Sequence, residues 1–396
     1  MGMEFRSYYL AREWQKKGHK VRIVAADFSH LRKQNPEVRK DFELQNIDGV
    51  EYQWIRTGRY EGNGLARAKT MFEFCGKLSL NAGNIVRSFR PDVVISSSTY
   101  PLDTYPAQRI AKIAGCRYIH EAHDLWPLTL TEIGGMDPRN PFVVLLGAAE
   151  REAYSGADKV VSLFPDAYKH MLEHGLQSRE KFVYLPNGIV TGDWEDAEKA
   201  PEEHTKLIGD LKKQGRFVVM YLGGHAISNA LDVLLDGAAL TEKDNNAAYV
   251  LVGKGVEKDR LMERAAKENL SNVFFLPPVS KRQVPSVLRE ADALYVGAAR
   301  SSLYRFGVSL NKVYDYMMAG RPIIYGVEAS NNDVADAGCG ITIKPDDPAA
   351  LAEAVKELLR MDPEDRDAMG ARGHESVINN YDYSIIAEKF LNIMTD

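Results

Sequence analysis

Runs of four to six apolar, often β-branched residues alternate along most of the chain with longer stretches in which apolar residues recur at helical spacing. Such short runs have the length and composition of buried strands. The helical patterns at 5–17 and 106–114 are each followed by a glycine, which commonly ends a helix. Alternation of strand and helix predicts a parallel sheet with helices on both faces. The first series of expected strands lies at 21–26, 92–96, 117–120, 159–163 and 182–185.

The alternation pauses and then resumes, which divides the chain in two. A charged, turn-rich stretch at 191–214 is predicted to be a linker. The second series of expected strands lies at 217–222, 248–252, 273–276, 293–296, 322–325 and 340–343. We therefore expect an α/β protein with two doubly wound, Rossmann-like domains, at 1–190 and 215–380, facing each other across a cleft. The helix at about 381–396 is a candidate to pack back on the first domain.

The beginning of the chain departs from this scheme. A doubly wound domain normally opens with a strand, a glycine-bearing turn and then a helix. This sequence starts in what reads as that first helix. We interpret the first strand of the N-terminal domain as missing, and we favour truncation of the chain over a true variant of the fold.

Composition excludes several classes of protein. The 396 residues are 45% hydrophobic and 27% charged, as in soluble globular proteins. No run of about 18 apolar residues occurs and no secretory signal opens the chain, so we expect a cytoplasmic location. The scattered Cys75, Cys116 and Cys339 offer neither a disulfide framework nor a clustered zinc site. Nucleic acid is not an expected partner, because the basic residues are dispersed and no recognition motif occurs.

Positive charge is concentrated in the first quarter of the chain. Residues 1–100 carry 17 lysines and arginines against 11 acidic residues, although the whole chain has a net charge of −5. Ordinary solvated helix faces are one explanation. The other is an approach to an anionic membrane surface or a phosphorylated acceptor. The stretch 62–90 mixes apolar and basic positions, so it reads either as helix core or as a peripheral membrane contact that admits a polyprenyl-linked acceptor.

The segment 306–324 carries the clearest chemical signal. A glycine-containing turn opens a short helix that ends at Gly320 and leads through Pro322 to an apolar strand. Amides at a helix N-terminus favour anions, because they lack backbone partners and point along the helix dipole. Lys312 adds a positive charge, and Asp315 lies about one turn further on, where a sugar hydroxyl could reach it. The segment therefore predicts a site for phosphate and ribose, in a protein that binds a nucleotide or a nucleotide sugar.

Polar residues also follow other predicted strands. His120 and His123 are spaced i, i+3, which could suggest a metal pair, but no third ligand is apparent, so a core or capping role is favoured for His120. For His123 and Asp124 the residues alone favour neither a functional nor a structural role. The turn that begins at Gly253 and the proline-rich turn before Ser280 also read as ordinary strand ends.

Six motifs lie at 2–14, 123–127 (HDLWP), 185–189 (LPNGI), 221–225 (YLGGH), 251–255 (LVGKG) and 306–324. Each is weak alone, but in their order and spacing they resemble the family 4 retaining glycosyltransferases of the GT-B fold. Within that family the closest likeness is to fucosamine transferase-like enzymes of bacterial O-antigen and capsule synthesis. The resemblance covers essentially the whole chain.

The resemblance implies a role for each matching residue. The family's Glu–seven residues–Glu motif binds ribose through its second acid, which matches Asp315, and the donor sugar through its first acid, which falls at Gly307. An arginine and a lysine that the family places after the first C-terminal strand are absent, and Lys312, with Arg305 and His225, is expected to substitute. The expected donor-binding residues are Gly224, His225, Asn229, Gly253, Val279, Ser309, Leu310, Asn311 and Asp315, and the expected catalytic residues are His123, Asp124 and Lys312.

The implied activity is transfer of a sugar, with retention at the anomeric carbon, from a nucleoside diphosphate sugar to a glycan or polyprenyl-linked acceptor. We expect a UDP-linked N-acetylated hexosamine or deoxyhexosamine as the donor and cell-surface polysaccharide as the product. No metal or other cofactor is expected, because amides and Lys312 would stabilise the leaving diphosphate. Two alternatives stay open. One is a nucleotide-sugar 2-epimerase, and the other is a non-catalytic nucleotide-sugar-binding subunit, which the vacant position at Gly307 permits.

Overall fold

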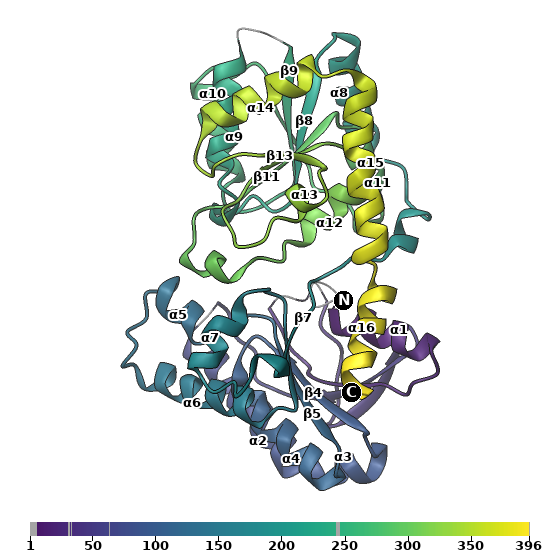
Figure 1. Ribbon diagram of the computed structural model, residues 1–396, viewed down its shortest axis with the longest axis vertical. Helices are drawn as coiled ribbons and strands as arrows, with labels where there is room; N and C mark the ends of the chain where they lie inside the picture. Colours follow the sequence, from purple (N-terminus) through teal and green to yellow (C-terminus); the bar gives the residue numbers. More distant parts are fainter. Residues whose placement is uncertain (1–5, 31, 33, 63, 243–245, 396) are drawn as a thin grey trace. The chain divides into compact units, whose positions relative to one another are not determined.

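The computed structural model describes residues 6–30, 32, 34–62, 64–242 and 246–395. The chain divides into two compact units (Figure 1). The N-terminal unit comprises the residues up to 187, the segment 305–309 and the tail from 383. The C-terminal unit comprises 188–304 and 310–382. Each unit places helices around parallel strands, which confirms the expected class of two Rossmann-like domains.

The strands of the N-terminal unit form two sheets. In the first, β1 (Arg22–Ala26) pairs in parallel with β3 (Val50–Ile55), and β3 pairs antiparallel with β2 (Glu43–Ile47). The second is parallel in the order β4, β5, β6, β7, with bounds Val93–Ser98, Arg117–Ala122, Lys159–Ser162 and Phe182–Tyr184. The expectation of a missing first strand concerns chain outside the described residues and stays a prediction.

The hairpin of β2 and β3 is not among the strands expected from the sequence. In β2 half-buried residues alternate with exposed ones, so it contains no continuous apolar run. Its turn consists of Asp48 and Gly49, with φ of 49° and 90°. Asp-Gly between alternating strands is a strong hairpin signal. That dipeptide, rather than hydrophobicity, was the signal from which the hairpin could have been predicted.

The C-terminal helix packs within the N-terminal unit, against the first helix. The Trp14 Nε1 donates a hydrogen bond to the Ala387 carbonyl oxygen (3.0 Å), and the Trp14 ring meets Phe390 edge-on at 5.3 Å. The helices of this unit are α1 (Arg6–Lys16), α2 (Leu65–Leu80), α3 (Ala82–Phe89), α4 (Thr104–Ala114), α5 (Leu128–Glu132), α6 (Pro141–Gly156), α7 (Ala167–Glu173) and α16 (Tyr383–Thr395), with short 3₁₀ turns at Pro101–Asp103 and Arg179–Lys181.

The C-terminal unit contains one six-stranded parallel sheet. Its order reverses between β8 and β11, and ligands of doubly wound sheets bind beyond the carboxyl ends of the strands at such a reversal. In spatial order the strands are β10 (Val273–Leu276), β9 (Ala247–Val252), β8 (Phe217–Leu222), β11 (Ala293–Gly297), β12 (Ile323–Gly326) and β13 (Gly340–Thr342).

Helices cover both faces of this sheet, as two separate buried clusters show. The stretch expected to be a linker contains α8 (Glu202–Lys213), and its Trp194, Ile208 and Leu211 are buried in one of these clusters. The other helices are α9 (Leu231–Thr241), α10 (Lys258–Lys267), α11 (Val284–Arg289), α12 (Asn311–Met318), α13 (Asp333–Asp336), α14 (Pro348–Arg360) and α15 (Pro363–Asn380), with 3₁₀ turns at Thr191–Trp194, Ile227–Asn229, Lys281–Gln283 and Ser302–Phe306.

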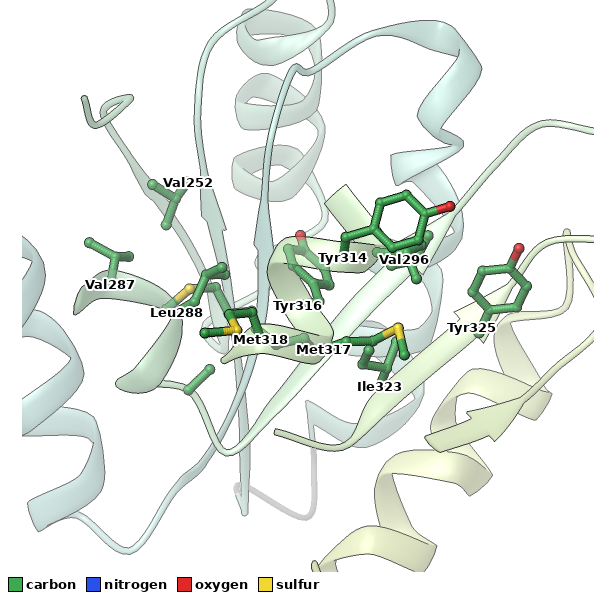
Figure 2. Packing of buried hydrophobic residues seen from close by; sticks show 14 of the residues in the cluster. Val252, Val287, Leu288, Val296, Tyr314, Tyr316, Met317, Met318, Ile323 and Tyr325 are labelled. Carbon is green, nitrogen blue, oxygen red and sulfur yellow. The ribbon is translucent and has the colours of Figure 1, made fainter. Parts of the chain in front are cut away.

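Helix α12 is fixed firmly in the core of the C-terminal unit. Its Tyr314, Tyr316 and Met317 pack among apolar side chains of α11, β11 and β12 (Figure 2). The hydroxyl of Tyr316 also accepts a hydrogen bond from the Leu222 N–H (2.8 Å) and donates one to the Leu222 carbonyl (3.1 Å). Because Leu222 ends β8, these bonds tie α12 to the carboxyl end of the central strand. Among the described helices, none has the length and apolarity needed to cross a membrane.

Candidate functional site

The start of α12 has the features of an anion site. Leu310 is its N-cap residue, in an extended conformation, and no side chain caps the helix. The first-turn amides of an uncapped helix lack backbone acceptors and lie at the positive end of its dipole. Asn311, the first helical residue, is exposed, whereas Val313 is buried. The free amides are therefore held on a rigid helix at its exposed end.

Lys312 lies in a cluster with Tyr221, near the end of β8, and with Gly224 and Asn229, which follow that strand. Its Nζ donates hydrogen bonds to the Tyr221 hydroxyl (3.2 Å) and to the Asn229 Oδ1. The Tyr221 hydroxyl and the Asn229 Nδ2 both donate to the Gly224 carbonyl, at 2.7 and 2.8 Å. Burial lowers the pKa of Lys312 to about 8. Lys312 therefore places a cation next to Asn229 and Gly224, where the family resemblance expected one.

Asp315 follows on the same helix and is half-buried. Burial raises its pKa to about 6, an effect that Lys281 opposes and Asp193 reinforces. Within the part of the chain that the structure describes, no donor forms a hydrogen bond with this carboxylate. A partly desolvated carboxylate without a donor can accept hydrogen bonds from a ligand's hydroxyl groups.

His225 is held in a tight turn beside β9. Its backbone N–H donates to the Lys254 carbonyl (2.9 Å), and its ring lies between Tyr221 and Phe275. A Cβ on Gly253 would lie 1.9 Å from the Gly223 carbonyl oxygen, so glycine at 253 permits the close approach of the two loops. The His225 ring is fully buried, and neither nitrogen has a partner among the described residues. Burial and then Lys258 lower its pKa to about 4, so the ring is neutral at pH 7.

The remaining expected donor residues, Val279 and Ser309, have other contacts. Val279 is in the loop after β10, half-buried against the core face that includes α8 and α12. Ser309 groups with the N-terminal unit, where its Oγ accepts a hydrogen bond from the Asn187 N–H (2.9 Å). The structure thus brings together Lys312, Asn229 and Gly224, with His225 and Gly253 adjacent to them along the loops. Leu310, Asn311 and Asp315 lie on or beside the same helix as Lys312.

In the N-terminal unit, the end of β5 carries a buried polar network. The Glu121 Oε1 accepts a hydrogen bond from the Arg6 Nε (2.9 Å), and the Glu121 Oε2 accepts from the Ser97 Oγ (2.5 Å). The His123 Nε2 lies 2.9 Å from both the Glu121 Oε2 and the Ser97 Oγ. Arg6 also donates to the carbonyls of residues 185 and 186. The network therefore fixes the position and orientation of the His123 ring.

The charges in this network support one another. Burial alone would raise the pKa of Glu121, but Arg6 and the bonds from His123 and Ser97 outweigh burial and hold the pKa far below its usual range. The neighbouring His120 is buried and bonds through Nδ1 to the Ser96 Oγ (2.9 Å), and burial lowers its pKa to about 4. A neutral, hydrogen-bonded His120 agrees with the core role favoured from the sequence.

The Asp124 side chain forms its hydrogen bonds within its own loop. Its Oδ1 accepts hydrogen bonds from the Leu125 N–H (2.8 Å) and the Thr129 hydroxyl (2.7 Å), and its Oδ2 accepts from the Trp126 Nε1 (3.1 Å). These three bonds hold the turn that leads into α5. They leave the carboxylate less capacity for contact with a ligand than His123 has.

The sequence did not single out Arg6, Ser97 or Glu121. Glu121 stands in a strand that carries the apolar Tyr118 and Ile119, and an acid in a buried strand must find a partner. The place of Glu121 in this strand was the feature of the sequence that could have identified it as a functional candidate. Arg6 could not be identified as the partner, because 115 positions separate the two residues and only the tertiary fold brings them together.

Two family models match consecutive parts of the chain. The Glycosyl transferase 4-like domain matches residues 1–188, and Glycosyl transferases group 1 matches residues 205–376. Among curated proteins, Probable glycosyltransferase WbjE of Pseudomonas aeruginosa is 23% identical over 84% of this chain and 80% of its own length. The protein named Putative colanic acid biosynthesis glycosyl transferase WcaI, of Escherichia coli (strain K12), is 21% identical over 88% of this chain and 86% of its own length.

Solved structures agree on the fold. Sucrose-phosphate synthase of Thermosynechococcus elongatus superimposes with a TM-score of 0.72 at 16% identity, covering 100% of this chain and 93% of its own. HepE of Anabaena, solved with UDP and glucose, gives a TM-score of 0.61 at 15% identity, covering 88% of this chain and 87% of its own. These likenesses show the GT-B fold. The chain is therefore a glycosyltransferase in which a Glycosyl transferase 4-like domain precedes a Glycosyl transferases group 1 domain.

Proposed function

We propose that the chain transfers a sugar, with retention at the anomeric carbon, from a nucleoside diphosphate sugar to a glycan or lipid-linked acceptor during synthesis of a cell-surface polysaccharide. The observation that carries this proposal is the presence on α12 of a half-buried cation, Lys312, together with a carboxylate, Asp315, that no described donor contacts. Lys312 is held by Tyr221 and Asn229, and Asp315 follows one turn later. A cation suits the charge of a diphosphate, and a carboxylate suits the hydroxyl groups of a ribose.

The named relatives support the substrate class. WcaI is named for the biosynthesis of colanic acid, and HepE was solved with UDP and with UDP-glucose. We infer a UDP-linked donor for this chain, with an N-acetylated hexosamine or deoxyhexosamine as the transferred sugar. GDP- and ADP-linked sugars are the alternatives that a binding screen separates.

The chemistry follows from where charge develops. As the glycosidic bond breaks, negative charge grows on the diphosphate, and the α12 amides and Lys312 stabilise it more strongly in the transition state than in the bound donor. His123, fixed by Glu121 and Ser97, is assigned to the donor sugar. The carboxylates of Glu121 and Asp124 are both engaged in hydrogen bonds within the N-terminal unit. Their engagement favours a front-face reaction over a covalent intermediate on either acid.

A membrane contact for the acceptor is proposed on α2 and α3. The side chains of Leu65 and Leu80 are 92% and 85% exposed at the two ends of α2, and the side chain of Lys69 is 77% exposed between them. Exposed apolar and basic residues on one helix are typical of peripheral binding to anionic lipid. We expect the protein to sediment with anionic vesicles at low salt and to be released as salt rises. Failure to sediment at any salt concentration would refute the membrane contact.

The donor assignment is tested by a thermal-shift screen against UDP-, GDP- and ADP-sugars. We expect one nucleotide series to stabilise the wild type and the control variant K213M, because the Lys213 side chain is 80% exposed on α8. The variant K312M should lose most of the shift and at least about 100-fold in turnover, the usual effect of removing one transition-state donor. Wild-type turnover in K312M would exclude the proposed role of Lys312.

Incubation with the donor alone separates the alternative functions. A transferase leaves the sugar nucleotide unchanged or slowly hydrolyses it until an acceptor is added. A 2-epimerase would convert it to its epimer without an acceptor. A binding subunit would retain affinity for the donor and give neither product.

A further inference from the structure

Two histidines and a glutamate lie together in the N-terminal unit, outside the residues assigned to the donor. Glu150 is on α6, His170 is on α7, and His174 immediately follows α7. Each side chain offers one ligand atom, and these three atoms lie within 4.8 Å of one another. The two histidines are four residues apart at the end of one helix, a spacing by which helical histidine pairs bind zinc.

The hydrogen bonds of these residues resemble those around metal ligands. The Nδ1 of His174 lies 2.8 Å from the His170 carbonyl oxygen. A carbonyl oxygen only accepts, so Nδ1 carries the proton and the Nε2 of His174 keeps its lone pair. Bonding of one ring nitrogen to a backbone carbonyl is the usual way in which a metal-binding histidine is oriented.

Glu150 brings negative charge to the same place. Its Oε1 accepts hydrogen bonds from the Tyr154 hydroxyl (3.1 Å) and the His170 Nε2 (2.7 Å). The side chains of Glu150 and His170 are 2% and 6% exposed. Throughout the described residues, no lysine or arginine forms an ion pair with Glu150. A buried carboxylate without a permanent cation is costly, and a bound divalent ion would supply the missing charge.

We propose that Glu150, His170 and His174 bind one divalent ion of the zinc class. Two imidazole nitrogens and one carboxylate oxygen form a donor set that favours zinc over magnesium or calcium. Bond lengths of about 2.0–2.1 Å place tetrahedral ligand atoms about 3.3 Å apart. The His170 Nε2 and the Glu150 Oε1, which lie 2.7 Å apart, would separate by about 0.6 Å, and the half-buried His174 would move by at most about 1.5 Å. Solvent can fill the fourth position from the side of His174.

Binding rearranges one proton. The ion occupies the place of the proton that the His170 Nε2 shares with Glu150, and that proton moves to the His170 Nδ1 by exchange with solvent. The centre of the His170 ring lies 4.0 Å from that of His174 and 5.8 Å from that of Phe306. The ion would hold α7 against α6. The ion takes no part in the proposed sugar transfer, so an experiment that refutes one proposal leaves the other unaffected.

The test is titration of the chelator-treated full-length protein with zinc ions in isothermal calorimetry. We expect one ion per chain, with at least 100-fold weaker binding in H174Q and in E150Q. H19Q is the matched control, because His19 is an exposed histidine outside the cluster, and it should bind like the wild type. Far-UV circular dichroism of each variant checks that it folds. Cobalt ions bound to the wild type should give the visible absorption of four-coordinate cobalt.

Three results would overturn the proposal. The first is the absence of stoichiometric binding to the wild type. The second is wild-type affinity in H174Q, which would place the ion on other surface ligands. The third is a six-coordinate cobalt spectrum that H174Q does not change. If H174Q fails to fold, the half-buried position of His174 makes E150Q and the cobalt spectrum of the wild type the deciding measurements.

Discussion

Replacing Arg6 by methionine tests the buried network that orients His123. The side chains of Arg6 and Glu121 are 5% and 2% exposed, so R6M leaves a buried carboxylate without its cation. It also removes the partners of the carbonyls at 185 and 186. Loss of one partner from a buried ion pair costs about 3–5 kcal/mol. Ser97 and His123 still donate to Glu121, so we expect a loss of about 3 kcal/mol in the free energy of unfolding.

The double variant R6M/E121Q separates the charge from the packing. Glutamine keeps the shape of Glu121 without its charge, so only the two carbonyls lose partners, at about 1 kcal/mol each. The double variant should therefore be more stable than R6M. Tryptophan fluorescence during urea unfolding reports mainly on this unit, because Trp14, Trp54 and Trp126 belong to it and only Trp194 belongs to the other.

The pH dependence gives an independent check on the same pair. The pKa of Glu121 in the folded state lies below its unfolded value of about 4.3, so the pair stabilises the fold above that pH. This contribution is lost as pH falls through the folded pKa. The difference between wild type and R6M should be full at pH 7 and shrink on acidification below about pH 4. A difference below about 1 kcal/mol at pH 7, or a double variant no more stable than R6M, would refute the reasoning.

Three further predictions concern the C-terminal unit. Donor affinity should be highest between about pH 6 and 8, because Asp315 is protonated below about 6 and Lys312 loses its proton above about 8; calorimetry across pH that shows no such window contradicts the assignment. D315N should bind the donor about tenfold more weakly, and unchanged affinity would argue against ribose at this site. G255A should lower the free energy of unfolding by 2 kcal/mol or more, because φ is 159° and the new Cβ would lie 2.2 Å from the His225 carbonyl oxygen. Its control G83A has open space around the Cβ and should be neutral or slightly stabilising in thermal unfolding.

The sheet of the C-terminal unit was predictable because its strands are buried on both faces. Continuous apolar runs mark such strands, and the expected 217–222 and 273–276 coincide with β8 and β10. The β2–β3 hairpin was missed because its residues alternate in polarity. The helix α8 was missed because the charged stretch around it reads as a linker, although Ile208 and Leu211 supply a buried face.

The candidate site could be predicted only where its residues are close in sequence. Lys312 and Asp315 share one helix, so their spacing is visible in the chain. The contact of Lys312 with Asn229 joins residues that are 83 positions apart. The only hint of it in the sequence was that the arginine and lysine expected after the first C-terminal strand are absent, so that another cation had to take their place. The His170–His174 spacing was also visible. The third residue of that cluster, Glu150, comes from another helix, so its place beside the two histidines became evident only in the structure.

The central claim is that the N-terminus of α12 and Lys312 bind the diphosphate of a nucleotide sugar while Asp315 binds its ribose. A crystal structure of the protein with its bound donor tests this claim most directly. The account predicts diphosphate oxygens within hydrogen-bond distance of the Lys312 Nζ and of the amides at 310–312, with ribose hydroxyls on the Asp315 carboxylate. A diphosphate bound at any other part of the chain would contradict it.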